Sequence, residues 1–313
     1  MTASKSSKRA IYAALIGNFL IAVTKFVAAA ITGSSAMLSE GVHSLVDTGN
    51  ELLLLYGLRR AAKAPDAAHP LGYGRELYFW SFIVALLVFS LGAGVSFYEG
   101  VVHLQRPQRV ENAFVTYIVL GLAMVFEGIS WWIALRAFRQ TKGNLGWFAA
   151  VRRSKDPTTF TVLLEDSAAL LGLMIAFVGI LLAQVLDIPE IDGIASLGIG
   201  LVLALTAAVL ARETKGLLIG EQASSGLEEA VLRLAAALPT VHRANGVITV
   251  HLAPDQVAVM LSAEFHDRST APEIEAAVVQ LERDLKTHFP QITALFVKPQ
   301  TAAAWSAQSS RTA

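Results

Sequence analysis

Six long, mostly apolar runs constrain this chain more than any other feature of its sequence. They cover residues 11–31, 36–58, 77–100, 113–137, 160–186 and 191–211. A helix needs roughly 20 mostly apolar residues to cross the hydrocarbon core of a bilayer, and each run supplies that length. Only 16% of the residues are charged, whereas a soluble domain has about a quarter. We therefore predict an all-α six-helix transmembrane domain over residues 11–215, embedded in membrane lipid and preceded by a short segment, residues 1–10.

The character of the sequence changes after residue 215, where charged residues become frequent and apolar runs shorten. Amphipathic stretches predict helices at 226–238 and 272–288. Alternating apolar residues predict strands at 247–252, 257–265 and 292–297. The order α-β-β-α-β predicts a small ferredoxin-like α+β domain over residues 216–300, with helices on one face of a sheet. Residues 301–313 are small and polar, and we expect a disordered tail.

The basic residues of the loops predict the orientation of the chain. The terminal segments and the loops after the second and fourth runs carry fourteen Lys and Arg residues, whereas the opposite loops carry only Arg106 and Arg109. The fourteen are Lys5, Lys8, Arg9, Arg59, Arg60, Lys63, Arg75, Arg139, Lys142, Arg152, Arg153, Lys155, Arg212 and Lys215. Positive charge accumulates on the cytoplasmic side. Both termini are thus expected in the cytoplasm, around a bacterial inner (plasma) membrane.

Charge balance and cysteine content exclude several classes of protein. The chain has 25 basic and 25 acidic residues, so no overall field attracts a nucleic acid. It contains no cysteine, which excludes disulfides, thiolate zinc sites, iron–sulfur clusters and a cysteine nucleophile.

Ionisable side chains inside the apolar runs are the candidates for function, because each costs about 2.5–3.5 kcal/mol to insert into lipid. They are Lys25 in the first run, His43 and Asp47 in the second, Glu127 in the fourth, and Glu165 and Asp166 in the fifth.

His43 and Asp47 are four residues apart, so they share one face of a helix, and Asn50 continues the same stripe. An imidazole and a carboxylate one turn apart can hold a divalent metal ion. The alternative is a hydrogen-bonded pair that joins two helices.

Glu165 and Asp166 are adjacent and point about 100° apart. We therefore expect one of them to complete a metal site and the other to pair with a cation or lie at a helix interface.

Glu127 and Lys25 admit two interpretations. They can form a buried ion pair between two spans, which neutralises both charges, or they can carry protons or gate the path, with Asn50 as a polar companion. The loop before the sixth run places Asp187, Glu190 and Asp192 together. We interpret these three as a solvated turn, with attraction of cations as the alternative.

The chain resembles the cation diffusion facilitator family in its six spans, in the His43–Asp47 pair of the second, in an aspartate of the fifth, in Asp192 at the start of the sixth and in its α+β tail. Within the zinc transporter group of that family, the strings HPLGYGRELYFWSFIVAL, GAGVSFYEG and LLEDSAALLG are similar to the branch that contains the ninth mammalian zinc transporter. The resemblance implies a homodimer joined partly through cytoplasmic domains. It implies export of a divalent cation, usually Zn²⁺, by proton antiport and alternating access, with no cofactor. His43 and Asp47 match the family's pair in span two, and Asp166 matches the aspartate of span five.

The position where the family has a histidine in span five is Val162. This departure leaves Glu165 as the substitute ligand and favours harder ions such as Mn²⁺ or Fe²⁺. Export of Mn²⁺ or Fe²⁺ is accordingly the alternative within transport. A membrane-embedded metallohydrolase is the alternative from another class, although the sequence contains neither HExxH nor GxSxG. A non-transporting protein that binds partners through its tail is the third.

Overall fold

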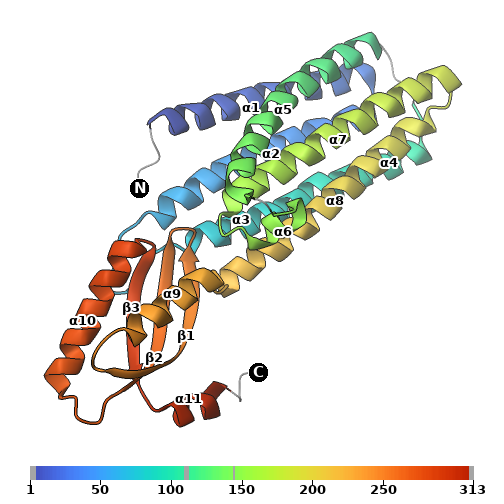
Figure 1. The fold of residues 1–313 in the computed structure, drawn as a ribbon. Coiled ribbons are helices and arrows are strands. Elements are labelled where there is room, and N and C mark those ends of the chain that lie inside the picture. The colour runs from blue at the N-terminus through green and yellow to red at the C-terminus, as the bar shows by residue number, and fades with distance from the viewer. Residues whose placement is uncertain (1–4, 109–112, 144, 310–313) are drawn as a thin grey trace. The chain divides into compact units, whose positions relative to one another are not determined.

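The computed structural model describes residues 5–108, 113–143 and 145–309. The ends of the two expected terminal segments, residues 1–4 and 310–313, lie outside the described residues. The chain divides into two compact units, Met1–Arg59 with Leu77–Lys215 and Arg60–Glu76 with Gly216–Ala313. We refer to them as the helical unit and the C-terminal unit. Their elements are labelled in Figure 1.

The helical unit is built from long helices. In chain order they are α1 (Lys5–Thr32), α2 (Ser35–Ala61), α3 (Glu76–Leu87), a π-helical turn (Val88–Ala93), α4 (Gly94–Gln105), α5 (Ala113–Lys142), the short α6 (Trp147–Arg153), α7 (Pro157–Leu186) and α8 (Glu190–Ile219). Within the described residues, four segments are long and apolar enough to cross a membrane: Glu76–Gln105, Phe114–Gln140, Pro157–Leu186 and Glu190–Ile219. The expectation of a helical membrane region is confirmed.

The first two predicted spans are also helical, but their composition differs. Asn18–Thr32 is a shorter apolar stretch within α1. Helix α2 buries many polar residues, including Glu40, His43 and Asp47. The two helices are separated by Gly33, whose φ of +68° is readily adopted only without a side chain.

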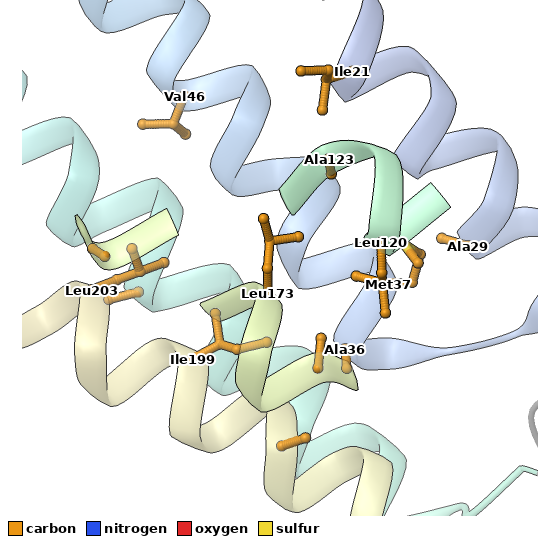
Figure 2. Close-up of a cluster of buried hydrophobic side chains, with 14 of the residues drawn as sticks. Ile21, Ala29, Ala36, Met37, Val46, Leu120, Ala123, Leu173, Ile199 and Leu203 are labelled. Carbon is orange, nitrogen blue, oxygen red and sulfur yellow. The ribbon is translucent and has the colours of Figure 1, made fainter. Parts of the chain in front are cut away.

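Small residues bring the helices of this unit into contact. A Cβ at Gly100 of α4 would lie 2.9 Å from the carbonyl oxygen of Gly193 in α8, so the two backbones touch there. In lipid, close packing of this kind replaces the hydrophobic driving force. Figure 2 shows the apolar cluster that results, with Met37, Leu120 and Leu173 converging from α2, α5 and α7.

The C-terminal unit contains α9 (Ser225–Ala236), β1 (Val241–Ala253), β2 (Gln256–Phe265), α10 (Ala271–His288), β3 (Ile292–Pro299) and α11 (Ala302–Ser309). The strands form one sheet in the order β1-β2-β3, with β1 and β2 antiparallel and β2 and β3 parallel. Alternate residues of β2, Val257, Val259 and Leu261, pack with Leu281 and Leu285 of α10 in the core. The expectation of a small domain with a sheet and helices is confirmed.

Two details of this unit differ from the sequence-based expectations. Strand β1 begins at Val241, six residues before the predicted start, and its ladder with β2 is interrupted by register shifts. In place of the disordered tail expected from residue 301, the structure has helix α11. The helix is held because the indole of Trp305 lies directly over Gly246, where any side chain would overlap it, and because Ala302 N–H donates to Glu264 (3.0 Å).

The loop between α2 and α3 belongs to the C-terminal unit. A Cβ at Gly74 would lie 2.8 Å from the carbonyl oxygen of Leu252 and 2.9 Å from Cβ of Ala253, so the loop backbone rests on β1. The Tyr73 hydroxyl donates to Asp66 (2.6 Å). That hydrogen bond, followed by the one from the backbone N–H of His69, lowers the pKa of the Asp66 carboxyl below its ordinary value.

Candidate functional site

Helix α2 carries a buried polar face that runs from its first turn to its middle. The Ser34 hydroxyl accepts from Met37 N–H (3.1 Å) and so caps the first turn. Asp192 of α8 accepts from Ser34 Oγ (2.8 Å), from Ser35 N–H (2.7 Å) and from Ser35 Oγ (3.0 Å). A buried carboxylate at a helix N-terminus satisfies the free N–H groups there and complements the helix dipole. These contacts hold the start of α2 against α8.

His43 and Asp47 lie one turn apart on this face, as their spacing predicts. Nδ1 of His43 is 3.5 Å from Oδ1 of Asp47. The imidazole is 1% exposed and Asp47 is 9% exposed. Neither ring nitrogen of His43 nor Oδ1 of Asp47 makes a hydrogen bond with any described residue. Buried polar atoms nearly always have partners, so this pair has its coordinating capacity free.

Glu165 and Asp166 of α7 point to different neighbours, as their adjacent positions require. Glu165 accepts from Asn50 Nδ2 of α2 (2.7 Å) and is buried. Asp166 accepts from Ser130 Oγ of α5 (2.9 Å). Asn50 thus links the helix that carries His43 to the helix that carries Glu165, while Asp166 faces α5.

The predicted ligands do not form one cluster in this conformation. Among the described residues, no three His, Asp or Glu side chains lie close enough together to hold a metal ion. Glu165 and Asp166 nevertheless lie within electrostatic range of Asp47. The structure therefore pairs His43 with Asp47 and Asn50 with Glu165. These two pairs do not combine into one metal site in this conformation.

Lys25 pairs with a residue that the sequence analysis did not single out. Its ammonium is 3.1 Å from Oε2 of Glu40 and 2.7 Å from the hydroxyl of Ser44, both in α2. In the described structure the ion pair expected between Lys25 and Glu127 is replaced by this one. Glu127 is 4% exposed and within electrostatic range of Lys25. The pairing differs because the Lys25 side chain is directed toward α2, and spacing along the chain does not reveal that direction.

The interpretation of Asp192 as part of a solvated turn is wrong. Its side chain is fully buried, and Nε2 of His103 lies 3.8 Å from its Oδ2. The turn itself ends α7 at Asp187, which has a left-handed backbone (φ 54°) and is exposed. Asp192 lies in the first turn of α8, where it accepts hydrogen bonds from the serines at the start of α2.

Two further carboxylates of α2 were missed by the sequence analysis. Glu40 is fully buried, and Glu51 accepts from Asn18 Nδ2 of α1 (2.9 Å). Helical spacing could have found both, since Glu40 precedes His43 by three residues and Glu51 follows Asp47 by four. Acidic side chains thus line α2 on both sides of the His43–Asp47 pair, an arrangement that can attract and pass a cation.

Comparisons with known proteins show which family the chain resembles. Residues 11–219 match the family model described as the cation efflux transmembrane domain. The chain is 32% identical over 267 residues to the mouse protein named proton-coupled zinc antiporter SLC30A9, mitochondrial, with 84% of this chain and 47% of that protein covered. It is 34% identical over 216 residues to metal tolerance protein C4 of Arabidopsis thaliana, with 68% and 47% covered.

A third relative matches along nearly its whole length. The cation-efflux pump FieF of Cronobacter sakazakii is 24% identical over 284 residues, with 91% of this chain and 89% of the pump covered. The chain spans about half the length of the mouse and plant relatives.

Proposed function

This chain belongs to the cation efflux, or cation diffusion facilitator, family, and we propose that it exports Zn²⁺ in exchange for protons. It is an integral membrane protein that transports a metal cation. Because members of the family are transporters and not enzymes, the metallohydrolase alternative is discarded. The proposal of Zn²⁺ and H⁺ as the exchanged ions is supported by the relatives named as proton-coupled zinc antiporters.

The observation that carries the proposal is the His43–Asp47 pair. It is buried, its Nδ1 and Oδ1 are 3.5 Å apart, and three of its polar atoms have no hydrogen bond within the described chain. Imidazole nitrogen and carboxylate oxygen both bind Zn²⁺, and both must lose their protons to do so. A proton and a metal ion therefore exclude each other at the same atoms, which is the physical basis of antiport.

We propose that Glu165 and Asp166 complete the site when α2 and α7 approach each other. Asn50 holds Glu165 at the α2 interface (2.7 Å), so Glu165 needs the smaller movement. Asp166 would have to leave Ser130. Assembly and separation of this four-residue site provide the two states that alternating access requires. Lys25, Glu127 and Asn50 are positioned to act on the metal ion and the protons as they move.

The arrangement of the chain in the membrane follows from the same proposal. We infer six spans, with α1 and α2 added to the four long apolar segments, and a membrane domain over 11–215 after the segment 1–10. A ferredoxin-like domain over 216–300 would regulate transport and join two copies of the chain, with residues 301–313 as its tail. Both termini would face the cytoplasm, and a bacterial inner membrane would supply the proton gradient.

Uptake into vesicles tests the function directly. Purified protein in proteoliposomes with an imposed pH gradient should accumulate Zn²⁺ and move protons in the opposite direction. Asp47→Asn and His43→Ala should each reduce Zn²⁺ flux by at least 100-fold while keeping the thermal melting profile. The exposed carboxylate variant Asp267→Asn is the matched control and should transport normally. Zn²⁺ flux by Asp47→Asn at the native rate would refute the site.

Transport of Mn²⁺ or Fe²⁺ is the second candidate, and Val162 favours it. A nitrogen donor is absent at this position of α7, one turn before Asp166, and fewer nitrogen ligands suit harder ions. A panel of Zn²⁺, Mn²⁺, Fe²⁺, Co²⁺, Cd²⁺ and Ni²⁺ in the same vesicles ranks the cargoes. Val162→His should shift the preference toward Zn²⁺; an unchanged ranking would remove α7 from the site.

A further inference from the structure

A complete ion pair lies inside the helical unit, between α1 and α2. Lys25 and Glu40 are both 0% exposed, and Nζ is 3.1 Å from Oε2. The ammonium also donates to Ser44 Oγ (2.7 Å). Burying two charges is favourable only with good geometry and further hydrogen bonds, and a well-packed apolar pair would join the two helices at less cost. The pair therefore calls for an explanation beyond stability.

The carboxylate of Glu40 has coordinating capacity that Lys25 does not use. Its Oε1 is buried and has no hydrogen-bond donor among the described residues, and the same holds for the hydroxyl of the adjacent Ser39. Oε1 lies against Gly172 of α7, where a Cβ would overlap it. The absence of a side chain at Gly172 thus makes room for this oxygen.

The ammonium is also placed to influence the proposed transport site. Glu40 precedes His43 by one helical turn, and the charge of Lys25 acts electrostatically on Glu40, His43 and Asp47. A cation bound at Glu40 and a cation bound at His43 would repel each other strongly at this depth. Lys25 already supplies one positive charge there, permanently attached to the chain.

We propose that Glu40 is a second cation subsite, beside the His43–Asp47 site, that the Lys25 ammonium occupies in this conformation. The oxygens of Glu40 and Ser44, which contact the ammonium in this conformation, are hard donors, so the subsite takes a divalent cation such as Mn²⁺ when the ammonium is removed. In the native chain the ammonium keeps the subsite neutral, and only one transported ion is held per chain. This inference rests on the proposed function for the position of the first ion.

Equilibrium metal binding to the purified full chain tests the subsite, with Mn²⁺ and Zn²⁺ measured separately. The native chain should bind one ion. Lys25→Met removes the ammonium and leaves Glu40 free, so bound Mn²⁺ should rise to two ions per chain. Two control variants should each bind one ion per chain. Lys25→Arg keeps a cation beside Glu40, and the double variant Lys25→Met with Glu40→Gln removes both charges. An unchanged single ion in Lys25→Met would overturn the subsite and leave a purely structural ion pair.

A second variant keeps the test decisive where Lys25→Met does not fold. Glu40→Gln leaves the ammonium without its carboxylate, one turn from His43, so metal affinity at the first site should weaken at least tenfold. Unchanged affinity overturns the subsite. Failure of the proposed function would be seen in a different variant. Asp47→Asn would then bind and transport as much metal as the native chain, independently of how many ions Lys25→Met binds.

Discussion

The two units of this protein use polar residues in opposite ways. In the helical unit the charged residues Lys25, Glu40 and Asp192 are fully buried and contact other helices. In the C-terminal unit, ion pairs such as Glu282–Lys286 (2.6 Å) lie at the surface and join residues one turn apart. A charge costs little in water and several kcal/mol in an apolar interior. The buried charges of the helical unit therefore require particular partners. The surface ion pairs of the C-terminal unit can be replaced by other polar residues at little cost in stability.

Large apolar residues are distributed in the opposite way: they are buried in the C-terminal unit, and many face outward in the helical unit. The C-terminal unit folds by burying Val259, Leu261 and Leu285 between sheet and helix, away from water. In the helical unit many large apolar residues face outward, including Phe114 and Val185, which are 76% and 71% exposed in the isolated chain. Lipid covers such residues in the folded and in the separated state. Polar contacts and close packing of small residues thus have to specify how these helices assemble.

Removal of Asp192 should have the largest effect on stability. Asp192→Ala leaves Ser34 Oγ, Ser35 N–H and Ser35 Oγ buried without their acceptor, at about 1–3 kcal/mol for each unsatisfied group. We expect a loss of at least about 3 kcal/mol, measured by thermal unfolding in detergent. Asp267→Ala, at an exposed turn of the C-terminal unit, should stay within about 0.5 kcal/mol. Equal losses would contradict the contrast between the units.

Matched leucine truncations should separate the two kinds of core. Leu285 and Leu173 are both 0% exposed. Leu285→Ala should cost about 2–5 kcal/mol, since it loses transfer from water as well as packing. Leu173→Ala should cost about half as much, because the unfolded side chain stays in lipid and only packing is lost. Hydrogen exchange of each unit in the full chain measures both, and a larger cost for Leu173→Ala would reverse our interpretation.

The loop that joins α2 to α3 should depend on Gly74. A methyl group at this position would meet the Leu252 carbonyl at 2.8 Å, so Gly74→Ala should cost about 1–3 kcal/mol in the C-terminal unit. Gly226 of α9 has open space where a Cβ would lie, since no described atom beyond its chain neighbours and its own helix backbone is within 4 Å. Gly226→Ala should therefore be neutral or slightly stabilising. Urea unfolding of the two variants side by side provides the measurement.

The smallest effect is expected at the start of α10. The Glu273 carboxylate accepts from the backbone N–H of Thr270 (2.8 Å), which lowers the pKa of Glu273 below its ordinary value. Because the folded pKa is lowered, the stabilisation is complete above the unfolded pKa of about 4.3 and is lost as pH falls through the folded value. Amide exchange in the first turn of α10 should accelerate there. Glu273→Gln should remove that pH dependence, and its persistence would assign it to another group.

Local spacing was sufficient for the parts of the site that lie on one helix. His43 and Asp47 are four residues apart, and the helix alone places Nδ1 near Oδ1. The divergence of Glu165 and Asp166 follows from the same geometry and is observed as contacts with Asn50 and with Ser130. Contacts between helices were not accessible in this way, because a small rotation of either helix exchanges one partner for another.

Residue types and their spacing were enough to predict that this chain lies in a membrane, that a small domain with a sheet follows, and that His43 and Asp47 share a helix face. Those properties depend on residue type and on a fixed helical period. The packing of the folded chain was needed to show that Lys25 pairs with Glu40, that Asp192 caps α2, and that Trp305 orders the tail over Gly246. Each of these contacts joins residues from different elements, so it depends on how those elements pack against each other. The pattern of apolar residues does not specify that packing.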